Sequence, residues 1–131
     1  MEYRFLEHTA DIMFEAYGKS YESALENAAK AMFSVLGSAE EKEGVSFSLS
    51  GHNLEELTVQ ALGDLLAYAD THEVVFSKMK VRKFDSKACS LEMEAWGDKK
   101  RPRDAVKAVT YHELAVTEGK EGWTIRVLLD V

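Results

Sequence analysis

The chain has 131 residues, of which 46% are hydrophobic and 30% are charged. This size and composition are typical of one ordinary globular domain and argue against a disordered chain. The formal net charge is -7, and the densest basic stretch is short, comprising Lys99, Lys100, Arg101 and Arg103. Direct RNA binding is therefore disfavoured as the main activity, because tracking a phosphate backbone requires much more positive charge.

The sequence also limits the compartment in which the protein works. It contains a single cysteine, Cys89, so no disulfide can form within one chain, and a reducing compartment is expected. The N-terminus lacks the pattern of a signal peptide, and no apolar run approaches the roughly 20 residues of a membrane span. We find no repeat or linker, and we expect one cytosolic domain over residues 1–131 with no membrane contact.

The first strong element along the chain is a helix that follows two short β-like pieces, the second at residues 12–17. Ser20 is a good N-cap, and Gly37 occupies a suitable C-cap position. Between them the apolar residues form one stripe at helical spacing. The stripe consists of Tyr21, Ala24, Leu25, Ala28, Ala29, Met32, Phe33 and Leu36.

The second helix is predicted to begin at Asn53, with Glu56 completing a capping box, and to end near Asp70. The other segments have strand character. They are residues 45–50, 74–84, 88–96, 106–116 and 123–131, with a hairpin at residues 85–87 and a connection at residues 117–122. Strands that follow one another without intervening helices favour antiparallel pairing. The predicted class is α+β, with two helices packed on a mostly antiparallel β-sheet.

Cys89 lies in register with Leu91, Met93 and Ala95 in the strand predicted for residues 88–96. A buried cysteine in such a pattern behaves as a small hydrophobic residue. We assign it no chemistry.

Two weak signals for a functional site lie near the ends of the chain. His8 and Asp11 stand at the junction before the strand at residues 12–17, where an aspartate is often only a turn former. At the other end the chain stays apolar and strand-like up to Asp130 and Val131, which suggests that the terminus is held in the sheet. The sequence alone does not establish that the two ends meet.

If Asp11, Asp130 and the terminal carboxylate of Val131 did meet, their charges would need compensation. Two like charges about 4 Å apart repel by about 4 kcal/mol at an effective dielectric constant of 20. Protonation, basic neighbours, or a hard cation such as Ca²⁺ or Mg²⁺ could offset this repulsion. In the strand at residues 106–112, Lys107 and Tyr111 share one face and His112 lies on the other, which by itself fits a half-exposed strand.

Three blocks of sequence carry a resemblance to a known family. They are residues 5–11 followed by 24–33, residues 54–70 followed by Val75 and Phe76, and residues 106–112 followed by Trp123 and the terminal Asp130 and Val131. In order and spacing these blocks resemble the archeases, and the resemblance covers nearly the whole chain. No signature position departs from the pattern.

The resemblance implies a compact α+β domain that assists RtcB-type RNA ligases in tRNA splicing and RNA repair. It implies that the protein is not itself an enzyme and has no catalytic residues, that it promotes guanylylation and repeated turnover of the ligase, and that it can relax the ligase's choice of nucleotide. It also implies a cation, calcium first with magnesium or manganese as alternatives, bound by Asp11, Asp130 and Val131. His8, Lys107 and Tyr111 are weaker candidates for contacting the ligase, and RNA would be met only through the ligase.

Two other functions remain open from the residues. In the first, Asp11 and Asp130 hold a metal that activates water in a phosphoesterase, with His8 and His112 as the available acid or base groups. In the second, the protein is a general chaperone or an RNA-binding module. Steep salt dependence of direct RNA binding would favour the RNA-binding version, and the acidic charge balance predicts its absence.

Overall fold

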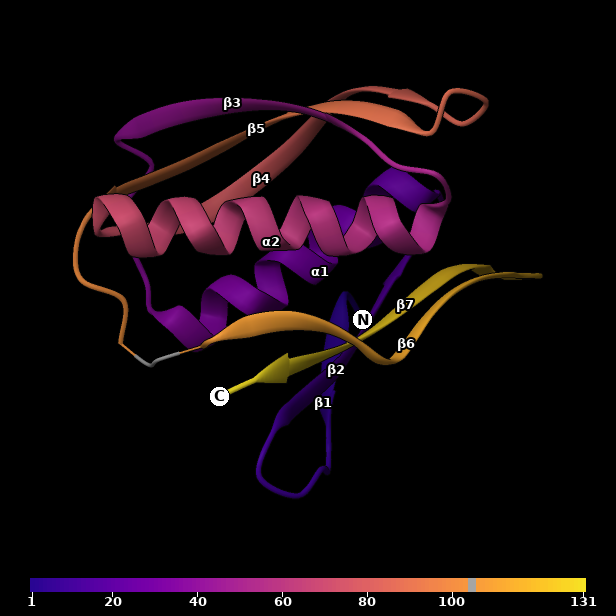
Figure 1. Ribbon diagram of the computed structural model, residues 1–131, viewed down its shortest axis with the longest axis horizontal. Helices are drawn as coiled ribbons and strands as arrows, with labels where there is room; N and C mark the ends of the chain where they lie inside the picture. The colour runs from indigo at the N-terminus through magenta and orange to yellow at the C-terminus, as the bar shows by residue number, and fades with distance from the viewer. Residues whose placement is uncertain (104–105) are drawn as a thin grey trace.

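A computed structural model describes residues 1–103 and 106–131 of the chain. Its elements alternate early in the sequence and then run as consecutive strands, as Figure 1 shows. In chain order they are β1 (Tyr3–Leu6), β2 (Ile12–Gly18), α1 (Tyr21–Leu36), β3 (Glu43–Ser50), α2 (Leu54–His72), β4 (Val74–Asp85), β5 (Ser90–Lys99), β6 (Ala108–Gly119) and β7 (Gly122–Asp130).

Helix α1 begins and ends where the sequence predicts. The Ser20 hydroxyl accepts a hydrogen bond from the Ser23 N–H at 3.1 Å, and the Gly37 N–H donates to the Phe33 carbonyl. Gly37 has a φ of 145°, a conformation that side-chain-bearing residues rarely adopt, so glycine ends the helix at low cost. All eight residues of the predicted stripe are buried, and Ala31 is buried as well. Helix α1 is therefore packed on more than one side.

Helix α2 begins at the predicted cap and extends two residues past the predicted end. The Asn53 side chain accepts a hydrogen bond from the Glu56 N–H at 2.8 Å, but the Glu56 carboxylate accepts from the His52 N–H. The reciprocal half of the capping box is thus formed with the residue before the cap. The helix ends at His72 because Glu73 adopts a left-handed conformation and its N–H donates to the Ala69 carbonyl.

The strands form two sheets, whereas the sequence analysis expected one. The terminal sheet has the strand order β1-β2-β7-β6, and the middle sheet has the order β3-β5-β4. Every pairing among the described residues is antiparallel. The α+β class with two helices is confirmed, and the single sheet is corrected to two.

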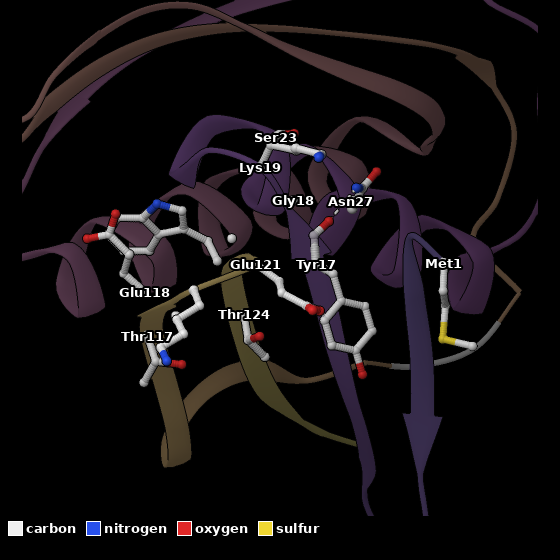
Figure 2. Close-up of a pocket in the computed structure, with 14 residues that line it drawn as sticks. Met1, Tyr17, Gly18, Lys19, Ser23, Asn27, Thr117, Glu118, Glu121 and Thr124 are labelled. Carbon is white, nitrogen blue, oxygen red and sulfur yellow. Dashed lines mark hydrogen bonds between the residues drawn. The ribbon is translucent and has the colours of Figure 1, made fainter.

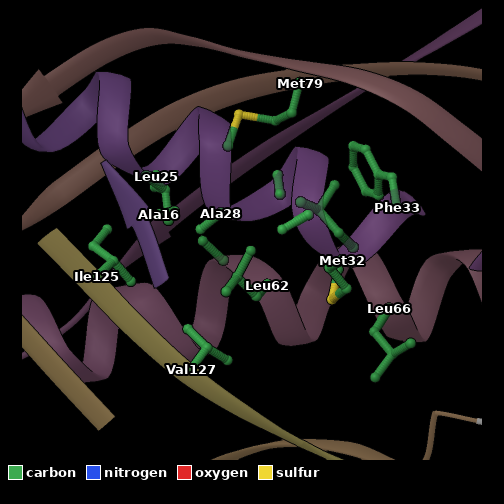
Figure 3. Packing of buried hydrophobic residues seen from close by; sticks show 14 of the residues in the cluster. Ala16, Leu25, Ala28, Met32, Phe33, Leu62, Leu66, Met79, Ile125 and Val127 are labelled. Carbon is green, nitrogen blue, oxygen red and sulfur yellow. The ribbon is translucent and has the colours of Figure 1, made fainter. Parts of the chain in front are cut away.

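The two helices lie between the two sheets, which explains the burial of α1 on several sides (Figure 1). Helix α1 contacts β2 and β7 of the terminal sheet and β4 of the middle sheet, while α2 packs mainly on β6. Figure 3 shows Met79 of β4 on one side of the helices and Ile125 and Val127 of β7 on the other. One hydrophobic core thus joins both sheets through the helices. Neither helix of the described ranges has an apolar stretch long enough to cross a lipid bilayer.

Three local expectations also change. The expected connection at residues 117–122 is only the turn of Lys120 and Glu121, because the strands pair up to Gly119 and Gly122. Val131 lies beyond the end of β7, and β6 begins at Ala108. Cys89 is buried as expected, but it lies in the turn before β5 with a left-handed φ of 51°.

Candidate functional site

The two ends of the chain meet where β2 begins and β7 ends. Ile12 is paired with Leu129 in the antiparallel ladder, so the same register continued by one residue places Asp11 opposite Asp130. Residues opposite each other in such a ladder project from the same face, with Cβ atoms roughly 5 Å apart. Asp11 directly precedes β2 and Asp130 ends the neighbouring β7, so the fold sets these two residues, 119 positions apart in the sequence, at the same end of adjacent strands.

Salt bridges compensate the charge of these carboxylates only weakly, although Arg103 lines the same surface pocket as Asp11. Among residues 1–103 and 106–131, the only salt-bridge partner of Asp11 is His8, whose Nδ1 lies 3.9 Å from Oδ2, and Asp130 has none. The Asp11 side chain is only 29% exposed, so water screens its charge incompletely. The like charges of Asp11 and Asp130 are thus left without a lysine or arginine partner in the described chain.

The terminal residues are held by main-chain bonding. The Lys107 N–H donates to the Asp130 carbonyl at 2.7 Å, just before Ala108 pairs with Asp130. This bond fixes the end of β7 between β2 and β6. Val131 follows directly and is 39% exposed. Val131 therefore lies next to Asp130 at the surface.

His8 connects the loop before β2 to strand β6, an arrangement that the sequence analysis did not anticipate. Its Nε2 lies 2.9 Å from Oε2 of Glu113, and its side chain is 24% exposed. His112 Nε2 lies 3.8 Å from the same Glu113 oxygen. The fold thus gathers His8 and His112, which the sequence placed on separate segments, around a carboxylate that sequence reasoning missed.

A bulge in β6 positions Glu113. Thr110 pairs with Leu128 and Ala115 with Arg126, so residues 111–114 lie opposite the single residue Val127. The Arg126 Nε donates to the Glu113 carbonyl at 3.0 Å and fixes the bulge to β7. The bulge ends the simple alternation of faces expected for residues 106–112. It leaves Tyr111 59% exposed, as one of the few large hydrophobic side chains on the surface.

Backbone strain is present on both sides of the contact between His8 and Glu113. Ala10 has a φ of 70° and Glu113 a φ of 55°, and both residues carry a Cβ that disfavours this conformation. Such strain costs on the order of 1–3 kcal/mol per residue and persists where surrounding contacts determine the backbone. Nothing in the sequence at position 113 signals this conformation, since neither glycine nor asparagine is present there.

A wide surface groove lies at the opposite end of β7 from Asp130. It has a volume of about 960 Å³ and lies between the start of α1 and the β6–β7 hairpin, as Figure 2 shows. The Asn27 amide in this groove is already used, since it donates to the Tyr17 carbonyl at 2.6 Å. No residue lining this groove is among the candidate site residues selected from the sequence, so the end of the terminal sheet at Asp11 and Asp130 remains the candidate site.

Within the described ranges no group of three or more His, Cys, Asp or Glu side chains is arranged to hold a metal ion. The fold defines an α+β protein whose helices lie between two antiparallel sheets and whose β2 and β7 carry Asp11 and Asp130 at the same end of the terminal sheet.

The same architecture occurs in known proteins. Residues 3–131 match the model of the archease protein family. An archease from Sulfurisphaera tokodaii is 37% identical over 138 residues, which cover 99% of each chain, and one from Methanosarcina mazei is 37% identical over 99% of this chain and 96% of its own. The chain belongs to the archease family.

Two solved structures resemble the fold closely. The solution structure of a Methanobacterium thermoautotrophicum protein has a TM-score of 0.75 and 35% identity and covers 99% of both chains. The crystal structure of a Thermotoga maritima archease, described as a possible chaperone, has a TM-score of 0.69 and 22% identity and covers 96% of this chain and 94% of its own. The second likeness concerns the fold alone.

Proposed function

We propose that this protein is a non-catalytic activator of an RtcB-type RNA ligase in tRNA splicing and RNA repair. It promotes guanylylation of the ligase, allows multiple turnovers and can alter which nucleotide the ligase accepts. The observation that carries the proposal is membership of the archease family over residues 3–131. The acidic net charge of -7 supports a role beside RNA through a protein partner.

The proposal includes a cation held by Asp11, Asp130 and the terminal carboxylate of Val131, with calcium favoured over magnesium or manganese. The proposal is supported by the position of Asp11 directly before β2 and of Asp130 at the end of the neighbouring β7, and neither carboxylate forms a salt bridge to lysine or arginine within the described residues. All three ligands are oxygens, which hard cations prefer. Only two are acidic side chains, in keeping with the absence of a three-side-chain cluster among the described residues. A bound cation would offset the repulsion between the carboxylates.

His8, Lys107 and Tyr111 surround this end of the sheet and are the proposed contacts with the ligase. Tyr111 offers an exposed aromatic ring on a bulge that Arg126 fixes to β7. Aromatic residues of this kind often anchor protein interfaces. The activator works by binding one state of the ligase more tightly than another, and about 100-fold activation needs about 2.7 kcal/mol of such preference.

A multiple-turnover ligation assay tests the proposal directly. Asp11→Ala and Asp130→Ala, each verified as folded, are expected to reduce stimulation of an RtcB-type ligase strongly, because each removes a proposed ligand. Glu121→Ala is the matched control, since it removes one carboxylate from the turn at the opposite end of β7. Normal stimulation by both aspartate variants would overturn the proposed role of this site. Failure of the unaltered protein to stimulate the ligase would overturn the proposed function itself.

The cation can be tested without any ligase. Titration of the protein with Ca²⁺ or luminescent Tb³⁺ should show one site whose affinity falls by about 100-fold or more in Asp11→Ala and Asp130→Ala, since each loses a charged ligand. The Glu121→Ala protein should bind as the unaltered chain does. Equal affinity in all four proteins would rule out this pair of carboxylates as the site.

One observation keeps a phosphoesterase as the second candidate. His8 and His112 both approach Glu113 near the paired aspartates, so acid and base groups are present at this end of the sheet. Incubating the purified protein with RNA or a phosphodiester in the absence of ligase separates the two functions. Cation-dependent hydrolysis lost in His8→Ala would favour the enzyme, whereas an activator leaves the substrate intact.

A further inference from the structure

Among the described strands, three of the four sheet edges are protected against pairing with a further strand. Strand β1 has only four residues, and β6 is interrupted by its bulge. Strand β4 has register shifts at Ser77 and Arg82, carries several lysines, and has its Val81 N–H bonded to the Glu26 carboxylate at 2.9 Å. Short strands, bulges and charged side chains are the usual protections of exposed edges.

The edge of the middle sheet at β3 has none of these protections. All eight residues of β3 pair with β5 without a register shift. Residues 44–50 contain no charged residue and no proline. Among the described elements β3 contacts only β5 and α2, so no strand covers its outer side (Figure 1). Over residues 44–50 the free edge is therefore regular, uncharged and open to another strand.

The unpaired backbone groups of this edge belong to alternate residues. The Gly51 N–H donates to the Cys89 carbonyl, which makes Gly51 and Cys89 a hydrogen-bonded pair. Hydrogen-bonded and non-hydrogen-bonded pairs alternate in an antiparallel ladder. The N–H and C=O groups of Ser46, Ser48 and Ser50 therefore point away from β5.

Apolar side chains along the same strand are incompletely buried. Val45, Phe47 and Leu49 pack against the core but remain half-exposed, whereas Leu91, Met93 and Ala95 opposite them on β5 are buried. An added strand would cover the apolar row on one face and satisfy the backbone row at the edge. Addition of one strand would therefore provide both the burial and the hydrogen bonds.

We propose that β3 pairs antiparallel with β3 of a second copy of this chain, about a two-fold axis at Ser48. This register sets Ser46 opposite Ser50 of the second copy and Phe47 opposite its Leu49, so like side chains meet on each face. The segment is suited to self-pairing because its serines and apolar residues alternate symmetrically about Ser48. A two-fold axis requires a self-complementary surface of this kind.

Charges within the paired segment do not oppose the association. The acidic Glu43 of each copy would lie at opposite ends of the shared ladder, so no like charges face each other within the paired segment. The contact is small beside the roughly 1,200–2,000 Å² of a stable interface, so a weak dimer is expected. This inference does not depend on the proposed ligase function, because it involves none of the residues at the end of β7.

Sedimentation of the full chain tests the association. The weight-average mass should rise from the monomer value of 14.7 kDa toward that of a dimer as the concentration increases from roughly 10 µM to 1 mM, the range of a weak complex. Ser48→Pro should hold the mass at the monomer value. It removes an N–H that points outward and is not used to pair with β5, and proline is tolerated at such an edge position.

A second pair of variants keeps the test independent of proline. Ser48→Lys should also abolish the rise in mass, because it places two positive charges opposite each other across the axis. Ser48→Thr should preserve it, since the N–H and strand preference remain. Ser86→Lys, in the exposed β4–β5 turn, is the control for added charge. A monomer at every concentration would overturn the proposal, as would a dimer that persists in both Ser48→Pro and Ser48→Lys.

Hydrogen exchange provides a residue-level test. In dilute protein the Phe47 and Leu49 amides should be protected by β5, while the Ser46, Ser48 and Ser50 amides exchange quickly. At high concentration the serine amides should slow by several-fold in the unaltered chain and in Ser48→Thr, but not in Ser48→Lys. Serine exchange that is independent of concentration would contradict pairing through this edge.

Discussion

The end of the terminal sheet at Asp11 and Asp130 and the free edge of β3 use the same antiparallel ladder in opposite ways. At the first, a bulge in β6 diverts residues 111–114 out of the ladder and brings Glu113 to His8. At the second, β3 stays in register over all its eight residues and leaves alternate backbone groups unpaired. Irregularity gathers side chains in one region, and regularity exposes the backbone in the other.

This difference matters because the two regions would bind by different chemistry. Side chains placed by a bulge can present charge and an aromatic ring to a chosen partner, which suits a cation or a protein surface. Unpaired backbone groups recognise an extended strand and are much less particular about its side chains. A substitution in one region should therefore leave binding by the other region unchanged.

The largest effect is expected from breaking the sheet that supports β3. In Gly97→Ala the new Cβ would collide with the backbone of Val75 and Phe76, so β4 and β5 must separate. We expect a loss of about 3 kcal/mol or more in the free energy of unfolding, measured by chemical denaturation. Gly63→Ala in α2 is the control, because nothing lies within 4 Å of its Cβ, and it should gain roughly 0.5–1 kcal/mol. Equal stability of the two variants would contradict the tight β4–β5 packing.

A smaller effect, on cation affinity, is expected from changing Glu113 in the β6 bulge. Glu113→Ala removes the contact that holds His8 and hence the loop carrying Asp11. We expect cation affinity to fall about tenfold, as for other groups that orient ligands, with the mass of the β3 dimer unchanged. Glu118→Ala on the same strand should alter neither property. A cation titration identical for Glu113→Ala and the unaltered chain would show that the bulge does not position the site.

The smallest effect is expected at Cys89, whose thiol reactivity indicates whether the pairing between Gly51 and Cys89 at the end of β3 is intact. Burial raises the pKa of the Cys89 thiol, so at a given pH less thiolate is present in the folded chain than in the unfolded one. Reaction with an aromatic disulfide reagent at pH 8 should be at least about tenfold slower in the native protein than in denaturant. The raised pKa also predicts that stability falls as the pH rises from the ordinary thiol pKa through the raised one. Rapid native reaction would indicate that the Gly51–Cys89 pairing is frayed.

The helices illustrate what local sequence can predict. Ser20 and Asn53 begin α1 and α2 as expected, since a cap acts through hydrogen bonds to residues three positions away. Strand positions were also predicted to within a few residues. The division into two sheets was not predicted. An apolar stripe indicates that a helix is buried, but it does not indicate how many sheets pack against the helix. Ala31 lies outside the predicted stripe and is nevertheless buried, because α1 packs against both sheets.

The candidate site also contains residues that the sequence predicted and residues that only the structure revealed. Asp11, Asp130 and His8 were selected from the sequence and its resemblance to archeases, while Glu113 was missed. The alternation of a strand carries no signal for a bulge whose conformation is imposed by Arg126 and by the ladder on either side. The prediction that Lys107 and Tyr111 share one face of a regular strand also missed the bulge, because the register changes after Thr110.

By itself, the sequence determined the composition of the core, the caps of both helices, the acidic charge and the family. These depend on residue types and on spacings within a few turns of chain. Only the tertiary structure decided that Asp11 and Asp130 lie at the same end of neighbouring strands, that His8 reaches Glu113, and that, among the described strands, β3 keeps an open and regular edge. Each of these depends on the register between strands distant in sequence, which is fixed by packing both sheets against the same two helices.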